Sequence, residues 1–195
     1  MTRISSENRK TRETTVDVAL SLDGGSEPQI STGIPFFDHM LTLFAVHGFF
    51  DLKIEAKGDI EVDFHHTVED VGIVLGNAFN AALGDRKGIN RFGFAVTPMD
   101  DALAQVALDL SKRPFLVYNL PILTGSSGSF GVSLAKEFFR AFSVSAGMNL
   151  HIHVPYGENE HHVIEAVFKS LGRAMDQACI VEPRVKQIRS SKGLL

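Results

Sequence analysis

The 195-residue sequence has a single cysteine and no tryptophan. With Cys179 alone an internal disulfide is impossible, and its apolar surroundings predict a buried thiol rather than a catalytic one. No run approaches the roughly 20 apolar residues of a membrane span, and residues 1–10 lack the apolar core of a signal peptide. A net charge of −4 gives no indication of a nucleic-acid partner. These absences favour a cytoplasmic globular enzyme without membrane contact.

Two copies of one motif stand out in this otherwise ordinary composition. His65-His66-Thr67-Val68-Glu69 recurs as His161-His162-Val163-Ile164-Glu165, 96 residues later. Each helical residue advances about 100°, so His65 and Glu69 lie one turn apart on one face, about 40° from each other. His66 points about 100° away from His65 and could reach a second ion. The doubled motif therefore predicts a two-metal site.

The residue types narrow the choice of metal. Imidazole and carboxylate suit Mn, Fe, Zn or Ni, and the absence of cysteine ligands argues against a structural zinc. His39 follows Asp38 and could add a ligand. A lone histidine is more often a hydrogen-bonded or surface residue, and we interpret the remaining three in that way: His47, His151 and His153.

Hydrophobic periodicity predicts four strands and four helices. Asp23-Gly24-Gly25 reads as the turn of a hairpin, and residues 125–129 as a loop. The strands are expected at Thr14–Leu22, Leu52–Ala56, Leu103–Leu110 and Asn149–Val154, and the helices at Phe36–Phe44, from His65 until Gly84 stops it, at Lys136–Ser145, and from His161 to about Cys179.

The two halves of the chain repeat this plan. With a shift of 96, matches between the two long helices include Leu75 with Leu171 and Gly76 with Gly172. The strand Val18–Leu22 is echoed by Val106–Leu110. We therefore expect an α+β fold made by tandem duplication of a half-domain. A single domain over residues 1–195 would consist of half-repeats 1–90 and 91–195, with the seam near residues 87–91.

With these residues assembled, the sequence closely resembles the imidazoleglycerol-phosphate dehydratase family over nearly the whole chain. The motifs that carry the resemblance are Arg9-x-Thr11-x-Glu13-Thr14, the run from Thr32 to Leu41, the run from Asp63 to Val71, Arg91-Phe92-Gly93, Asp109-Leu110-Ser111-Lys112-Arg113-Pro114, the second metal motif through Lys169, and Ser191-Lys192-Gly193.

The resemblance implies a fold of the ribosomal protein S5 domain 2-like type, in which two mixed β-sheets flank a layer of helices. It implies a homo-24-mer of octahedral symmetry with active sites between subunits. The activity implied is that of a hydro-lyase of histidine biosynthesis. It would convert imidazole glycerol phosphate, a small phosphorylated imidazole, to imidazole acetol phosphate and water.

The resemblance also implies two Mn²⁺ ions per active site. One ion would take His39, His66, His161 and Glu165, and the other would take His65, Glu69 and His162. The fourth ligand of the second ion is usually a histidine, and this chain has Glu137 there. Because a carboxylate can bind Mn, Glu137 stays a candidate. Asp101 is a second departure, since the family generally has Glu there; it is the repeat partner of Glu13.

Three carboxylates are the candidates for proton transfer: Glu13 first, then Glu69 and Glu165. Two Lewis acids on the ring nitrogens would help the ring expel the neighbouring hydroxyl and give a diazafulvene-like intermediate. Arg91 and Arg113 are expected to bind the phosphate. The full set expected at the substrate is Glu13, His39, His65, Glu69, Arg91, Arg113, His161, Lys169, Ser191, Lys192 and Gly193.

Two rival interpretations remain open at this stage. A dinuclear phosphatase would use the same ligand types, and phosphate release from a simple phosphomonoester would support it. A metal-buffering protein would hold coordinatively full ions and would need no phosphate site. It would leave Arg91, Arg113 and Lys192 without a role.

Overall fold

The computed structural model describes residues 3–121 and 130–195, so the loop expected at residues 125–129 lies outside the described residues. Each half contributes four strands and two helices. The first half comprises β1 (Ile4–Lys10), β2 (Thr14–Ser21), β3 (Gln29–Ser31), α1 (Pro35–Gly48), β4 (Asp51–Gly58) and α2 (His65–Leu83). The second comprises β5 (Phe92–Met99), β6 (Ala102–Asp109), β7 (Phe115–Asn119), α3 (Val132–Ala146), β8 (Asn149–Tyr156) and α4 (Glu160–Cys179).

The two sheets have the same topology. Their strand orders are β1-β2-β4-β3 and β5-β6-β8-β7. In each sheet the first two pairings are antiparallel and the last, β3 with β4 or β7 with β8, is parallel. Val18 pairs with Ile54, and Val106 pairs with Ile152 at the corresponding place. The predicted α+β fold with a duplicated half-domain is therefore confirmed.

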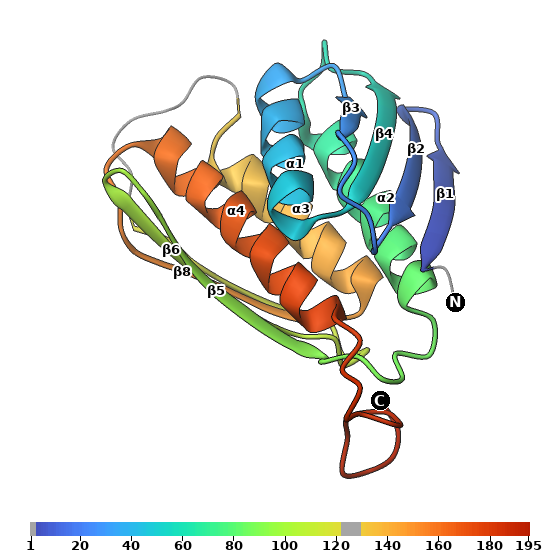
Figure 1. Ribbon diagram of the computed structural model, residues 1–195. Helices are drawn as coiled ribbons and strands as arrows, with labels where there is room; N and C mark the ends of the chain where they lie inside the picture. Colours follow the sequence, from blue (N-terminus) through green and yellow to red (C-terminus); the bar gives the residue numbers. More distant parts are fainter. Residues whose placement is uncertain (1–2, 122–129) are drawn as a thin grey trace.

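The four helices form a layer between the two sheets (Figure 1). α2 packs on β1 and β2, and α4 packs on β5 and β6. The remaining helices cross between the halves, because α1 packs against α4 and α3 packs against α2. The apolar residues of both halves consequently form one continuous core. Among the described residues, no helix is long and apolar enough to cross a membrane.

The four predicted helices are confirmed, and α1 and α3 are clearly longer than expected. α2 begins at His65 and ends at Leu83, as predicted, before Gly84, whose φ of 55° with ψ of −123° suits glycine. α1 extends to Gly48 and is followed by Phe49 in the left-handed region. Cys179 is 2% exposed at the end of α4, as predicted. Burial raises the pKa of its thiol to about 12.

The hairpin predicted at Asp23-Gly24-Gly25 is wrong. β2 pairs with β1 and β4, while the next strand, β3, pairs with the far side of β4. The chain therefore crosses over the end of the sheet. The Asp51 carboxylate accepts hydrogen bonds from the backbone N–H of Gly25 at 2.8 Å and of Ser26 at 2.6 Å, which anchors the crossing segment to the start of β4.

Four strands were not predicted: β1, β3, β5 and β7. All four lie at sheet edges, where much of each strand is exposed, and β1, β3 and β7 contain no fully buried residue. β5 even inverts the usual pattern. Its small residues Gly93 and Ala95 face the helices, while Phe92 and Phe94 face outward and are 51% and 68% exposed. Gly93 lies so close to α4 that an added Cβ would sit 1.9 Å from the Ala174 carbonyl oxygen.

Glycines allow the helices to approach each other closely. A Cβ added to Gly172 on α4 would lie 2.4 Å from the Phe44 carbonyl oxygen on α1. A Cβ on Gly76 of α2 would lie 2.8 Å from the Phe142 carbonyl oxygen on α3. The two glycines are the repeat partners found in the sequence. Their backbone contacts fix the spacing of both helix pairs.

Gly172→Ala is expected to destabilise the protein, although alanine is the better helix former. Its methyl group would meet backbone that cannot rotate away, and such overpacking costs about 1–3 kcal/mol. Thermal denaturation of the metal-free protein measures the effect. Ser133→Ala, at an exposed position of α3, is the matched control and should change stability little. Equal melting temperatures for Gly172→Ala and the unaltered protein would contradict the close-packing argument.

Candidate metal-binding site

Both histidine pairs lie in the first turn of a long helix. In both helices the side chain two residues before the first histidine accepts a hydrogen bond from that histidine's backbone N–H. The Asp63 carboxylate accepts a hydrogen bond from the His65 backbone N–H at 2.8 Å. The Asn159 side chain accepts one from the His161 backbone N–H at 2.9 Å. Such oxygens satisfy helix N–H groups that have no partner within the helix. The side chains of both pairs therefore project at the beginning of α2 and of α4.

One group of donors already has the geometry of a metal site. His39 on α1 meets His161 and Glu165 on α4, and the three ligand atoms lie within 4.8 Å of one another. Glu165 Oε2 is 3.1 Å from His161 Nε2 and 3.6 Å from His39 Nε2. Neighbouring donors on an octahedral ion lie about 3 Å apart when the bonds are about 2.1 Å. We call these three residues the first donor cluster; they fit a divalent metal ion.

Glu165 is a buried carboxylate with a fixed cation beside it. Burial pushes its pKa upward, but the hydrogen bond and charge of Lys169 and the hydrogen bond from His161 outweigh this, so the pKa is lowered. Lys169 Nζ lies 2.6 Å from Glu165 Oε1. The carboxylate is therefore held ionised, as a metal ligand must be. Its Oε2 points to the two imidazoles while Oε1 is occupied by Lys169.

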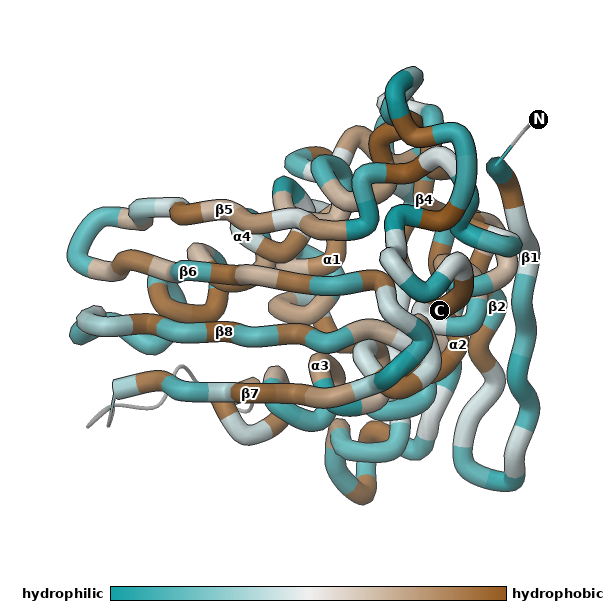
Figure 2. Tube along the Cα trace, turned by 90° about the horizontal axis from the view of Figure 1, so that it is seen from below, coloured by the Kyte–Doolittle hydropathy of each residue, from teal (hydrophilic) through white to brown (hydrophobic). Residues whose placement is uncertain are grey.

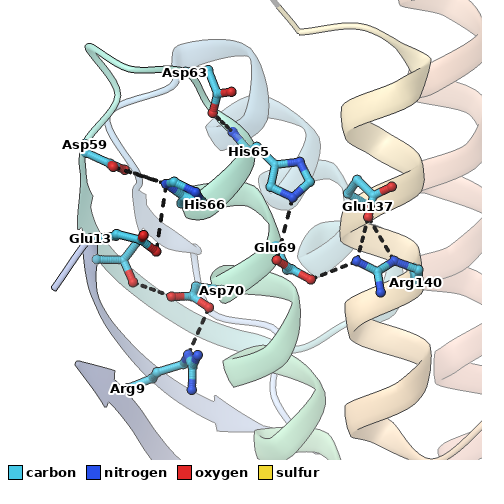
Figure 3. A network of polar contacts seen from close by, with 11 residues as sticks. Arg9, Glu13, Asp59, Asp63, His65, His66, Glu69, Asp70, Glu137 and Arg140 are labelled. Atoms are coloured by element: carbon cyan, nitrogen blue, oxygen red, sulfur yellow. Dashed lines mark hydrogen bonds and ion pairs between the residues drawn. The ribbon is translucent and has the colours of Figure 1, made fainter. Parts of the chain in front are cut away.

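A second group lies between α2 and α3 (Figure 3). His65 Nε2 is 3.7 Å from Glu69 Oε2, which confirms that the i and i+4 side chains face each other. Across the helix pair lies Glu137, but the guanidinium of Arg140 stands between the two carboxylates. Arg140 Nη2 is 2.8 Å from Glu69 Oε1 and 2.7 Å from Glu137 Oε2. We call His65, Glu69, Glu137 and Arg140 the second donor cluster.

His66 and His162 turn away from their neighbours and take carboxylate partners of their own. His66 Nδ1 lies 3.1 Å from Asp59, and this hydrogen bond, with a smaller effect of Glu13, raises the pKa of His66. His162 Nδ1 lies 2.5 Å from Asp101, which raises the pKa of His162 and depresses that of Asp101. Within one chain, therefore, the structure does not bring His66 to the first donor cluster.

Glu13 is held near His66 by the motif that surrounds it. The Thr11 hydroxyl accepts hydrogen bonds from the backbone N–H of Glu13 and Thr14, which forms the turn between β1 and β2. Arg9 and the Thr14 hydroxyl both donate to Asp70, which is buried on α2. Glu13 itself is exposed, and its Oε2 lies 3.9 Å from His66 Nδ1 (Figure 3). The motif thus ties this turn to the helix that carries His66.

Asp101 occupies the corresponding turn of the second repeat, between β5 and β6. Besides His162, it accepts hydrogen bonds from the backbone N–H of Glu158 at 2.6 Å and Asn159 at 2.9 Å. The shorter side chain therefore orients His162 and also holds the loop that leads into α4. Glu13 and Asp101 are equivalent in the fold, and each lies beside the second histidine of its motif.

The cations expected to bind phosphate lie together, far from the histidines that begin α2 and α4. Arg91 is buried; its guanidinium binds both oxygens of Asp109 at 2.6 and 2.9 Å and donates to the Arg189 carbonyl oxygen at 2.7 Å. Arg113 is exposed, and its Nη2 lies 3.9 Å from the same Asp109. The Arg189 contact brings the tail that carries Ser191, Lys192 and Gly193 close to Arg91.

The separation of these groups follows from the length of α4. The Arg91 backbone N–H donates to the carbonyl oxygen of Ala178 at the end of α4, whereas His161 begins that helix. At 1.5 Å per residue, the 17-residue interval spans about 25 Å. Figure 1 shows the C-terminal tail beyond the end of α4, at the opposite end of the helix layer from the helix starts. One chain therefore does not bring metal donors and phosphate cations together.

The remaining histidines agree with their expected structural roles. His47 is half-buried at the end of α1, where burial and the charges of Lys169 and Arg173 lower its pKa. His151 and His153 are exposed on one face of β8. Sequence reasoning missed Asp59 and Arg140. The i, i+3 spacing of Glu137 and Arg140 is typical of an ion pair within one helix. It does not indicate that Arg140 also contacts Glu69 on α2.

Comparison with known proteins assigns the family. Residues 32–175 match the family model described as imidazoleglycerol-phosphate dehydratase. Proteins of that name from Desulfosudis oleivorans and Pelobacter propionicus are 63% and 54% identical over all of this chain and all of theirs.

Solved structures agree with the sequence relatives. Imidazoleglycerol-phosphate dehydratase from Staphylococcus aureus is 39% identical with a TM-score of 0.82, covering 91% of this chain and 99% of its own. The enzyme from Pyrococcus furiosus, solved in complex with (S)-C348, is 37% identical with a TM-score of 0.84, covering 96% and 99%. The chain therefore belongs to the imidazoleglycerol-phosphate dehydratase family and is a hydro-lyase of histidine biosynthesis.

Proposed function

We propose that this chain dehydrates imidazole glycerol phosphate to imidazole acetol phosphate with two Mn²⁺ ions per active site, in sites shared between copies of the chain. The observation that carries the proposal is the first donor cluster, in which two imidazoles and an ionised carboxylate converge in a member of the dehydratase family. A cytoplasmic location accords with a role in amino-acid biosynthesis.

The donor chemistry suits the proposed ions. His39, His161 and Glu165 would hold one ion, and His65 and Glu69 would hold the other, with Glu137 as a further candidate. Mixed imidazole and carboxylate sets suit Mn²⁺, and the few donors at each cluster leave positions for substrate. Bound divalent ions would act as Lewis acids on the imidazole ring. His66 and His162 would complete the two sites from neighbouring copies, after exchanging their present carboxylate partners.

The same geometry supports the proposal that active sites are shared between copies. Because about 25 Å of helix separates the first donor cluster from Arg91, a small phosphorylated imidazole cannot touch both within one chain. Donors from one copy and phosphate cations from another satisfy this constraint. The required association is proposed to be the homo-24-mer of octahedral symmetry. Self-association has further support in the outer face of the second sheet, where Phe92, Phe94, Val96 and Phe115 are 47–68% exposed (Figure 2).

The proposed roles of the remaining residues follow from their positions. Glu13, an exposed carboxylate beside His66, would accept the proton that the substrate side chain loses after the hydroxyl has left as hydroxide; the proton and the hydroxide together account for the water released. Glu69 and Glu165 would assist that transfer. Arg113, Ser191, Lys192 and the Gly193 N–H would bind the phosphate. Arg91, whose donors are engaged by Asp109 and the tail, would hold that tail in place as well as contribute charge. Lys169 would meet the substrate beside Glu165.

The function is tested with metal-free protein reloaded with Mn²⁺ and supplied with imidazole glycerol phosphate. Formation of imidazole acetol phosphate without release of inorganic phosphate is expected. Release of phosphate from this substrate or from a simple phosphomonoester would favour the phosphatase alternative. Tight Mn²⁺ binding without either reaction would favour a metal-buffering protein.

Glu165→Gln should weaken Mn²⁺ binding at the first donor cluster, because the amide carries no charge and Glu165 faces both imidazoles. Loss of a residue that only hydrogen-bonds to a metal ligand costs about 10–100-fold in metal affinity. Loss of a direct ligand should cost at least that much. Binding is measured from the free Mn²⁺ signal in electron paramagnetic resonance. Glu55→Gln, at an exposed position of β4, is the control. Unchanged affinity in Glu165→Gln would remove it from the ligand set.

Arg113→Ala should raise KM for the phosphorylated substrate with a smaller effect on kcat. A lost charged hydrogen bond costs about 1.5–3 kcal/mol, which corresponds to roughly a 10- to 150-fold increase. Steady-state kinetics measures both constants, and Arg173→Ala is the control for loss of a surface guanidinium. A KM equal to that of the unaltered protein would place the phosphate elsewhere.

Removal of metal should shrink the assembly, because the proposed ligands join different copies. Sedimentation velocity before and after chelation, and again after Mn²⁺ is restored, measures the particle size. We expect smaller species without metal and recovery on reloading. An identical particle in all three samples would show that the ions do not link the subunits.

A further inference from the structure

The two carboxylates of Glu69 and Glu165 divide their oxygens in the same manner. Glu165 presents Oε2 to His161 and gives Oε1 to Lys169 at 2.6 Å. Glu69 presents Oε2 to His65 and gives Oε1 to Arg140 at 2.8 Å. In both clusters one oxygen faces imidazole and the other faces a basic side chain. Each Glu therefore offers one free oxygen to an ion.

The two basic residues are not products of the duplication. Lys169 lies on α4, one turn after Glu165, whereas the residue one turn after Glu69 on α2 is Ile73. β4 begins at Asp51 and β8 at Asn149, so the preceding helices α1 and α3 correspond with a shift of 98. At that shift Arg140 corresponds to Thr42. The cations of the two clusters therefore come from different helices, at positions that do not correspond in the repeat.

The same shift explains why the second donor cluster needs a guanidinium. His39 on α1 corresponds to Glu137 on α3, so an imidazole is replaced by a second carboxylate. Two carboxylates would repel each other unless a cation lies between them. Arg140 supplies that cation with a fork of donors: its Nε and Nη2 lie 2.8 and 2.7 Å from Glu137 Oε2, and its Nη2 also reaches Glu69. Figure 3 shows the guanidinium between the two acids.

We propose that Arg140 is a positioning residue that determines which metals the second donor cluster accepts. It occupies Oε2 of Glu137 and Oε1 of Glu69, so an ion meets the His65 imidazole and one remaining oxygen of each carboxylate. That donor set favours transition metals such as Mn²⁺. Without Arg140, two further carboxylate oxygens would become free, Oε2 of Glu137 and Oε1 of Glu69. An oxygen-rich, negatively charged site suits Ca²⁺, which takes six to eight oxygen ligands.

This inference rests on the proposed two-metal function, and competition between Mn²⁺ and Ca²⁺ tests it. Metal-free, full-length protein is loaded with Mn²⁺ and titrated with Ca²⁺, and displaced Mn²⁺ is followed by electron paramagnetic resonance. In Arg140→Gln, Ca²⁺ should displace about half of the bound Mn²⁺ at a concentration at least tenfold lower than in the unaltered protein. The other half, at the first donor cluster, should resist as before.

Two further variants separate this role from a merely structural one. Glu137→Gln combined with Arg140→Gln should restore resistance to Ca²⁺ to within about threefold of the unaltered protein, because the freed carboxylate is gone. Arg173→Gln removes a surface guanidinium of α4 that contacts no carboxylate within residues 3–121 and 130–195, and it should behave as the unaltered protein. A role limited to folding would lower the melting temperature and weaken both ions equally, without a Ca²⁺-specific change.

The outcomes distinguish a failure of the two-metal function from a failure of the role proposed for Arg140. If the unaltered protein fails to bind Mn²⁺, the two-metal function itself is overturned, and the role of Arg140 with it. If Mn²⁺ binds normally but the Ca²⁺ titrations of Arg140→Gln and the unaltered protein coincide, only the role of Arg140 is overturned. The same follows if the double variant stays as sensitive to Ca²⁺ as Arg140→Gln.

Discussion

The close contact of helices from opposite halves of the chain is the constraint on which the candidate site depends. Gly172 lets α4 approach the Phe44 carbonyl on α1, and Gly76 lets α2 approach the Phe142 carbonyl on α3. Because these helices run side by side from their first turns, His39 arrives opposite His161 and Glu165. A wider spacing of α1 and α4 would separate the three donors. Core packing and metal geometry are thus set by the same backbone contacts.

A single chain supplies all the expected residue types but not a complete active site. The imidazoles project from the beginnings of α2 and α4, whereas Arg91, Arg113 and the tail gather about 25 Å away, beyond the end of α4. His66 and His162 face carboxylates of their own chain instead of the first and the second donor cluster, respectively. The proposed association of several copies would explain this division, because it would bring one end of a chain against the other end of a neighbour. Within the single chain, the carboxylate partners hold these histidines in place.

Much of the fold could be predicted because duplication and helical periodicity are strong signals. The bounds of α2 were correct to the residue, since the motif marks the start and Gly84 marks the end. Edge strands escaped prediction because their side chains are largely exposed, and in β5 the bulky residues face outward. The false hairpin at Asp23-Gly24-Gly25 had the right turn residues. The partner of a strand, however, is decided by tertiary contacts, here those of Asp51.

The residues of the candidate site could likewise be predicted only in part. Spacing on one helix identified the pairs His65 with Glu69 and His161 with Glu165, because a chelate one turn apart is local information. The meeting of Glu69 with Arg140 depends on how α2 packs against α3, which no local pattern reveals. Asp59 was missed for a similar reason, since it approaches His66 from a loop. Residues that orient a ligand side chain from another helix or loop are therefore the ones that a single sequence does not reveal.

The central claim is that donors from different copies of the chain meet at paired manganese ions. A crystal structure of the Mn²⁺-loaded assembly, with anomalous scattering recorded at the manganese edge, tests it most directly. The account predicts two anomalous peaks per chain, one at His39, His161 and Glu165 and one at His65 and Glu69, each also touched by a histidine from another copy. Peaks ligated entirely within one chain, or no peaks at these side chains, would contradict it.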